Sequence, residues 1–282
     1  MKKSVALLLT LACAFSMVAC GAKTEEAPAA TEEAVVEEAA TEEAATEEAA
    51  TEEAATEEAA TEEADVKSEG VMTYEEYAAA ALDTEVTVET YVQAKQSWWE
   101  DKATVYTQDK DGAYFLYEMA CSEEDYAKLV PGTKIRVNGY KAEWAGEVEI
   151  IEATFEILEG SYIAEAEDMT AMLASEELVD HQNKFVAFKG MTVEASKDAD
   201  GNDVAFLYNW DGSGEDGNDL YFNVSLDGQT YTFTVESYLC DNTTDVYAAV
   251  KNLQIGDVVD MEGFLYWYEG VNPHITSLTV VE

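Results

Sequence analysis

An order of short strands and helices that occurs twice after Gly70 constrains the fold of this 282-residue chain more than any other feature. In the first copy, β-branched and aromatic residues alternate with polar ones between glycine turns, a pattern typical of short antiparallel strands. A helical segment opens the copy after Met72, and a second helix starts at Ser122, whose hydroxyl can cap free amides, and ends at Pro131-Gly132. We expect five strands around these helices, at 86–94, 103–107, 113–119, 134–140 and 148–157.

The C-terminal part of the chain repeats this order. Gly263 and Gly139 occupy the same offset in their copies, and Cys240 and Cys121 each lie just before a helix start. An insertion rich in Asp and Gly follows the first strand of the second copy, at about 198–217. The first three strands of this copy are expected at 185–195, 220–226 and 230–237.

Three strands, a helix and two strands is the element order of an OB fold, a five-stranded Greek-key barrel. The sequence therefore predicts an all-β protein with short helices, in which two tandem OB-like barrels, 70–160 and 161–282, follow a disordered acidic tether. In this order, and in the glycine turn before strand four, the chain resembles the tandem OB-like domains of Gram-positive bacterial surface lipoproteins. The resemblance implies a ligand face on strands two and three, where OB domains often bind oligonucleotides or oligosaccharides.

The N-terminus has the pattern of an export signal. Lys2 and Lys3 precede an apolar run that ends at Ala19-Cys20. This resembles a bacterial lipoprotein signal, with Met17 in place of the usual Leu, and implies removal of residues 1–19 and lipidation of Cys20. The alternative is a transmembrane helix, but the run is shorter than the roughly 20 residues needed to span a bilayer. We expect a lipid-anchored protein, carrying acyl chains such as palmitate, on the extracytoplasmic face of the cell membrane.

Residues 20–69 are predicted to form a disordered linker. From Thr24 to Ala64 the chain is built on the repeat T-E-E-A-A. A five-residue period leaves no continuous apolar stripe on a helix, and neighbouring glutamates without lysines repel each other. The segment suits a solvated stalk, and a low-complexity insert without a purpose is the alternative.

The charge of the folded part narrows the partners that we expect. Residues 70–282 hold 42 acidic against 11 basic side chains, a formal charge of −31. Because nucleic-acid affinity depends on cationic side chains that displace counterions, we expect no nucleic-acid partner. Divalent cations, cationic surfaces and neutral ligands stay open.

Two cysteines remain after the leader and the lipidated residue are set aside. Cys121 and Cys240 each have their own place in a repeat, so we expect two separate buried thiols. A disulfide is the chemical alternative in an exported protein.

Aromatic side chains gather where we expect loops at the ends of the barrels. Stacked rings there can hold a sugar or a peptide, because each ring offers a flat apolar face with a polar edge. The alternative is that at least one ring of each group belongs to the core, since adjacent strand residues point to opposite faces. The candidate ligand contacts are Trp98, Trp99, Tyr140, Trp144, Tyr266, Trp267 and Tyr268.

The insertion opens like a calcium loop, with Ser196-Lys197-Asp198 followed by further oxygen-bearing residues. Leu207 stands where an EF-hand requires a bidentate Glu, and the flanks have strand character, so any Ca²⁺ cage would be irregular. A plain Asp-Gly-Asn turn explains the same residues. The candidate ligands are Asp198, Asp200, Asn202, Asp211 and Asp216.

Catalytic motifs do not emerge from the sequence. The two histidines, His181 and His274, are far apart, and neither lies in a motif with a nucleophilic Ser or Cys. We expect no enzyme and no cofactor other than a possible Ca²⁺. The predicted function is a membrane-anchored binding or adaptor module for a glycan or peptide. The alternatives are a subunit that binds another envelope protein and a calcium-dependent binding module.

Overall fold

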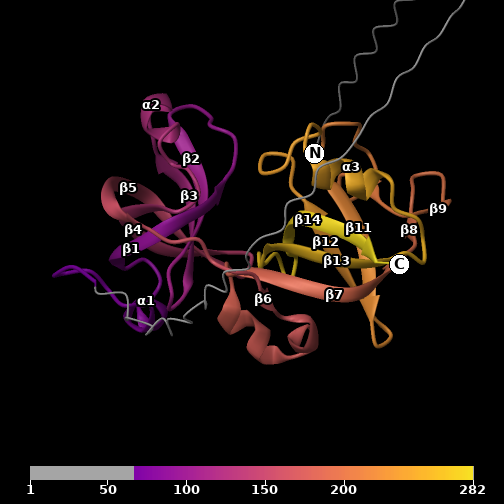
Figure 1. Cartoon of the computed structure of the whole chain (residues 1–282), viewed down its shortest axis with the longest axis horizontal. Helices are drawn as coiled ribbons and strands as arrows, with labels where there is room; N and C mark the ends of the chain where they lie inside the picture. Colours follow the sequence, from indigo (N-terminus) through magenta and orange to yellow (C-terminus); the bar gives the residue numbers. More distant parts are fainter. Residues whose placement is uncertain (1–66, 282) are drawn as a thin grey trace, which may run out of the picture. The chain divides into compact units, whose positions relative to one another are not determined.

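The computed structural model describes residues 67–281, which belong to one compact unit and form two five-stranded barrels in sequence (Figure 1). The leader, Cys20 and the acidic repeat lie outside the described residues, so what the sequence predicts of them stays a prediction. Within residues 67–281, no helix is both long enough and apolar enough to cross a bilayer.

The first barrel is closed by its own strands in the order β1-β2-β3-β5-β4. Strands β3 and β5 are parallel, and β1 closes the barrel by antiparallel pairing with β4. Helix α1 (Tyr74–Ala79) has a capping box made by Thr73 and Glu76, and α2 (Glu123–Tyr126) is capped by Ser122 as expected. The strands are β1 (Glu85–Lys95), β2 (Lys102–Gln108), β3 (Ala113–Ala120), β4 (Thr133–Trp144) and β5 (Glu147–Ser161).

The second barrel repeats this order. Its strand order is β7-β11-β12-β14-β13, and the β11–β7 and β13–β7 pairings close it. Helix α3 (Asp245–Lys251) follows the third strand of the barrel. The strands are β7 (Phe185–Glu194), β11 (Leu220–Leu226), β12 (Gln229–Val235), β13 (Val258–Phe264) and β14 (His274–Val281). The predicted fold class, tandem OB-like barrels with short helices, is therefore confirmed.

Short elements decorate the second barrel. Strand β6 (Glu167–Asp168) and two 3₁₀ helices, η1 (Thr170–Met172) and η2 (Glu176–His181), precede β7 where the sequence predicts a helical segment. The insertion after β7 holds a small β8–β9 hairpin and a strand that pairs with β11. These strands are β8 (Ser196–Lys197), β9 (Asp203–Val204) and β10 (Leu207–Tyr208).

One hairpin is longer than its sequence pattern indicates. Strands β4 and β5 are joined by a two-residue turn in which Ala145 and Gly146 both have positive φ, 51° and 94°. This geometry matches the twist of paired strands, so pairing continues to the turn. Tyr140 and Trp144 consequently lie on β4, and their predicted placement on loops is wrong.

The duplicated glycines mark bulges at equivalent places. The β4–β5 register shifts between Asn138 and Tyr140, and the β13–β14 register shifts between Glu262 and Gly263. A Cβ added at Gly139 would lie 2.8 Å from the backbone oxygen of Ile151. Strands four and five therefore approach closely in both barrels, where only glycine fits.

The two cysteines are free and buried, as predicted. Cys121 packs in the core of the first barrel and Cys240 in the core of the second. Each thiol thus fills an equivalent place in its own barrel.

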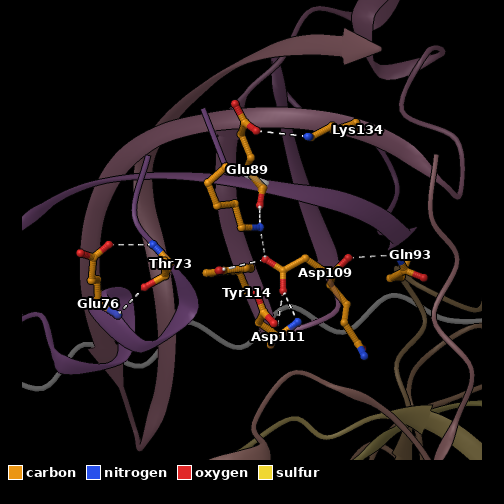
Figure 2. A network of polar contacts seen from close by, with 11 residues as sticks. Thr73, Glu76, Glu89, Gln93, Asp109, Asp111, Tyr114 and Lys134 are labelled. Atoms are coloured by element: carbon orange, nitrogen blue, oxygen red, sulfur yellow. Dashed lines mark hydrogen bonds and ion pairs between the residues drawn. The ribbon is translucent and has the colours of Figure 1, made fainter. Parts of the chain in front are cut away.

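A buried ion pair fixes the start of the described chain to the first barrel. The Lys67 ammonium lies 2.7 Å from Asp109 Oδ2 and donates to the backbone oxygen of Glu89. Tyr114 donates to the same Asp109 oxygen, while the backbone amides of Asp111 and Gly112 donate to the other (Figure 2). Asp109 therefore organises the β2–β3 turn and holds Lys67 at once.

We expect Asp109→Asn to lower the free energy of unfolding by roughly 3 kcal/mol, because the amide nitrogen cannot accept a hydrogen bond and the Lys67 charge loses its buried partner. Urea titration followed by circular dichroism measures the change. The matched control is Asp203→Asn, which breaks an exposed pair with Lys197 and is expected to cost less than about 1 kcal/mol. Equal effects of the two substitutions would contradict the assigned role of Asp109.

Gly263→Ala is expected to destabilise the second barrel by at least about 2 kcal/mol. Its Cβ would lie 2.2 Å from the backbone oxygen of His274, and this contact requires one strand to move. Gly201→Ala is the control, since its Cβ meets nothing within 4 Å and only its left-handed φ of 83° is unfavourable. Thermal unfolding should rank Gly263→Ala clearly below Gly201→Ala in stability.

Candidate ligand grooves at the barrel junction

An aromatic cluster joins the two barrels. Tyr106 on β2 stacks on Phe264 of the second barrel, with ring centroids 4.4 Å apart and planes at 18°. Phe115 on β3 packs in the same cluster, and Tyr106 Oη lies 2.7 Å from His274 Nδ1. Tyr106 and Phe115 come from strands two and three of the first barrel. In that barrel, part of the ligand face implied by the resemblance is therefore covered by the second barrel.

Hydrogen bonds surround this cluster on several sides. The backbone amide of Trp267 donates to Glu147 Oε2 at 2.8 Å, and the amide of Phe185 donates to Gln108 Oε1 at 2.7 Å. The amide of Glu269 donates to the backbone oxygen of Ala145 at 2.7 Å. Three backbone amides of the second barrel therefore donate hydrogen bonds to the first barrel. These bonds hold the two barrels in one orientation at the junction.

A groove of about 580 Å³ lies on strands two and three of the second barrel, and we call it the β11–β12 groove. Tyr221 and Thr234, which pair across β11 and β12, line it. The loop after β10 adds Trp210, which is 76% exposed, and the loop after β13 adds Tyr268. Strands two and three with the loops between strands one and two and between four and five are the parts that OB folds use for ligands.

The first barrel completes one wall of this groove. Trp144, at the end of β4, lies 5.2 Å from the Tyr268 ring between centroids. Asp219, Thr234 and Asn272 supply polar groups, and Thr234 donates to Asn272 Oδ1 at 2.7 Å. The groove therefore combines exposed rings with hydrogen-bonding side chains.

A second groove, of about 490 Å³, lies beside strands β2 and β3, and we call it the β2–β3 groove. Trp99, 68% exposed, and Tyr117 from the first barrel line it together with Tyr238 from the second. Lys102, which also lines it, is paired with Glu118. This groove is therefore also aromatic, and its cation is neutralised by a neighbouring carboxylate.

Three residues line both grooves: Glu236, Tyr266 and His274. The Tyr266 ring stacks on His274, with centroids 4.2 Å apart and planes at 23°. Burial lowers the pKa of His274 to about 3, so its imidazole is neutral at physiological pH. The surface common to both grooves thus consists of the uncharged Tyr266–His274 ring pair and the carboxyl group of Glu236.

That carboxyl group, Glu236, is 9% exposed. Burial, with a smaller contribution from nearby Asp219, raises its pKa to about 7, while hydrogen-bond donors nearby, including the Gln96 side chain, act in the opposite direction. Oε1 accepts a hydrogen bond from the backbone amide of Tyr238 at 3.2 Å. No described residue makes a hydrogen bond of standard geometry to Oε2.

The seven predicted aromatic contacts divide into two groups. Trp99, Trp144, Tyr266 and Tyr268 line one or both grooves. The others line neither: Trp98 donates from Nε1 to the backbone oxygen of Cys121, Trp267 packs on the core of the second barrel, and Tyr140 is exposed on β4. The alternative that one ring of a group belongs to the core thus fits Trp267, whereas Trp98 is held by a hydrogen bond to the backbone.

Sequence reasoning missed five Phe, Tyr or Trp residues that line the grooves: Phe115, Tyr117, Trp210, Tyr221 and Tyr238. Tyr221 alternates with the buried Leu220 and Phe222 along β11, and this period was a usable signal. Tyr117 follows four consecutive buried residues of β3, so no alternation marks it. Trp210 and Tyr238 lie outside regular strands, and only the folding of their loops brings them to the grooves.

The five candidate calcium ligands make local contacts instead of one cage. Asp198 accepts from the backbone amides of Asp200 and Asn202, which is the plain turn that the sequence left as the alternative. Asp216 pairs with Lys251, and Asp211 accepts from the backbone amide of Ser213. Across residues 67–281, no three His, Cys, Asp or Glu side chains form a group that could hold a metal ion.

Strand order and groove position define the chain as a tandem OB-type protein. No family model matches the sequence, and no curated protein matches it. Solved structures of similar fold include a tetrameric p202 HIN2 domain, at 11% identity and a TM-score of 0.30, covering 71% of this chain and 95% of that one.

Two further similar structures contain DNA. A murine DNA-binding protein bound to double-stranded DNA matches at 10% identity and a TM-score of 0.31, over 70% of this chain and 95% of that one. A replication protein A heterotrimer bound to single-stranded DNA matches at 11% identity and a TM-score of 0.28, over 70% of this chain and 49% of that one.

These structures correct one expectation. The acidic charge predicts that nucleic acid is not a partner, and this prediction is contradicted because proteins of similar fold are seen in complexes with DNA. Net charge is a property of the whole surface, whereas a ligand meets only one face of a barrel. Charge alone therefore does not exclude nucleic acid for a chain of this fold.

Buried carboxyl groups at the junction are expected to make stability fall as pH rises. Burial raises the pKa of Glu147 from 4.5 to about 8, so the folded protein binds more protons than the unfolded chain between these values. The contribution of Glu147 is present below about pH 4.5 and is lost as pH rises through 8, at up to about 1.4 kcal/mol per pH unit. Burial of Glu149 and Glu236, each with a pKa raised to about 7, acts in the same direction.

Glu147→Gln should therefore flatten the dependence of unfolding free energy on pH, and it should raise stability relative to the parent protein more at pH 8 than at pH 5. Urea titrations at both pH values measure this. Glu165→Gln, at an exposed position, is the control and should leave the profile unchanged. An unchanged profile in Glu147→Gln would contradict the assignment.

Proposed function

We propose that this chain is a non-enzymatic binding protein that holds a carbohydrate in the β11–β12 groove. The observation that carries the proposal is the set of exposed rings, Trp144, Trp210 and Tyr268, beside the polar groups of Thr234 and Asn272. Sugar rings have apolar faces that stack on aromatic side chains and hydroxyl groups that exchange hydrogen bonds with amides and carboxylates.

The electrostatics of the groove favour an uncharged or cationic ligand. Asp219, Glu236 and Glu269 line it, and no Lys or Arg does so among the described residues. An anionic ligand would meet carboxylates without compensating cations. Neutral glycans have no such cost, and glycans that carry amines gain attraction.

The leader adds a location to this proposal. The resemblance of residues 1–20 to a lipoprotein signal supports lipid attachment at Cys20 and display on the extracytoplasmic face of the membrane. The T-E-E-A-A repeat would then lie between the anchor and the barrels. A cell-surface binding protein that recognises glycans is consistent with this arrangement.

Trp210→Ala and Tyr268→Ala are each expected to weaken carbohydrate binding roughly five- to fiftyfold, because each removes a ring that stacks on the ligand. A glycan array screened with the purified 67–282 part and with the full chain identifies a ligand, and calorimetry measures the affinity. Tyr140→Ala is the matched control, since this ring is exposed on β4 but lines neither groove.

Two results would contradict the proposal. One is the absence of binding to any glycan. The other is binding to a peptide or to single-stranded DNA that Trp210→Ala abolishes, which would assign the groove to a different class of ligand.

A further inference from the structure

We infer that the two grooves form one track for a linear glycan, and that Glu236 is the specificity-determining residue that selects a glycan carrying an amine where the grooves meet. The inference rests on the proposed function and deepens it, by naming the length and the chemical class of the ligand.

Continuity of the track follows from the shared residues. Glu236, Tyr266 and His274 line both grooves, so a ligand that fills one groove reaches the other without leaving the protein surface. The stacked pair of Tyr266 and His274 gives a flat floor at this point. Trp99 in the β2–β3 groove and Trp210 in the β11–β12 groove are exposed rings at which successive sugar units can stack.

The amine preference follows from the Glu236 carboxyl group. Its Oε2 is buried and accepts no hydrogen bond of standard geometry from the described residues, although it belongs to a side chain that lines both grooves. The Gln96 side chain, which lines the β2–β3 groove, is a nearby donor to this carboxyl group but makes no hydrogen bond of standard geometry to Oε2. A poorly partnered buried oxygen is unfavourable, and a ligand donor placed there removes that cost. A protonated amine donates a hydrogen bond and supplies the opposite charge, so it gains more than a hydroxyl group.

His274, Lys102 and Asp219 already have partners, so Glu236 is the group available to a ligand amine. The neutral His274 uses Nδ1 with Tyr106, and the only cation lining either groove in the described part of the chain is Lys102, which pairs with Glu118. Asp219 accepts hydrogen bonds from the amide and hydroxyl of Ser237. No lining cation therefore competes with a ligand amine for Glu236.

The experiment compares two tetramers of the same linkage and length, β-1,4-linked glucosamine and β-1,4-linked N-acetylglucosamine, by calorimetry at about pH 7.5. At this pH the Glu236 carboxyl group, with a pKa of about 7, is mostly ionised, and the pH is still below the usual pKa of an amine. The parent protein is expected to bind the glucosamine tetramer more tightly. Glu236→Gln should lower affinity for this tetramer roughly ten- to a hundredfold and leave affinity for the acetylated tetramer nearly unchanged. Glu165→Gln, a change at an exposed acid that lines neither groove, is the matched control and should preserve the preference.

A second variant tests the track. Trp99→Ala should weaken tetramer binding several-fold but not the binding of a dimer, which the β11–β12 groove alone can hold. Thermal unfolding of each variant shows that folding is retained.

The outcomes separate this inference from the proposed function. If both tetramers bind equally and Glu236→Gln changes neither, the amine preference is wrong although carbohydrate binding stands. If Trp99→Ala leaves tetramer binding unchanged, the shared track is wrong. If neither tetramer binds while other neutral glycans do, the assigned ligand class is overturned, and if no glycan binds, the proposed function fails with it.

Discussion

The stacking of Tyr106 against Phe264 is the contact on which the arrangement of the functional surface depends. Both rings are nearly inaccessible to water, and the Tyr106 hydroxyl finds its partner in His274 of the other barrel. A buried tyrosine hydroxyl usually has a hydrogen-bond partner, and here the partner comes from the second copy of the fold. Burial of that histidine in turn keeps it neutral and provides the surface on which Tyr266 stacks.

The face formed by strands two and three differs between the two barrels. In the first, strands two and three present Tyr106 and Phe115 to the second barrel. In the second, the equivalent strands carry Tyr221 and Thr234 and stay open to the β11–β12 groove. Trp144 from the first barrel then forms a wall of that groove. The site we propose is thus a product of both copies, although only one copy supplies its floor.

Much of the fold could be predicted from the sequence because its signals are local. The alternation along the strands, the cap at Ser122 and the repeated glycines each act over a few residues, and the structure has them in the expected elements. The β4–β5 hairpin was underestimated because Ala145-Gly146 is not one of the usual turn pairs, although both residues adopt positive φ. The site was harder, since Trp210 and Tyr238 reach the grooves through loop geometry that no short pattern encodes. Net charge did not suffice to exclude nucleic acid, because it is a sum over the whole surface and a ligand contacts only one face.

The buried pair between Lys67 and Asp109 also has a mechanical consequence. The Lys67 ammonium group lies against both the β2–β3 turn and β1 of a closed barrel. A pull applied at Lys67 is therefore shared between these two segments, and neither strand takes it alone.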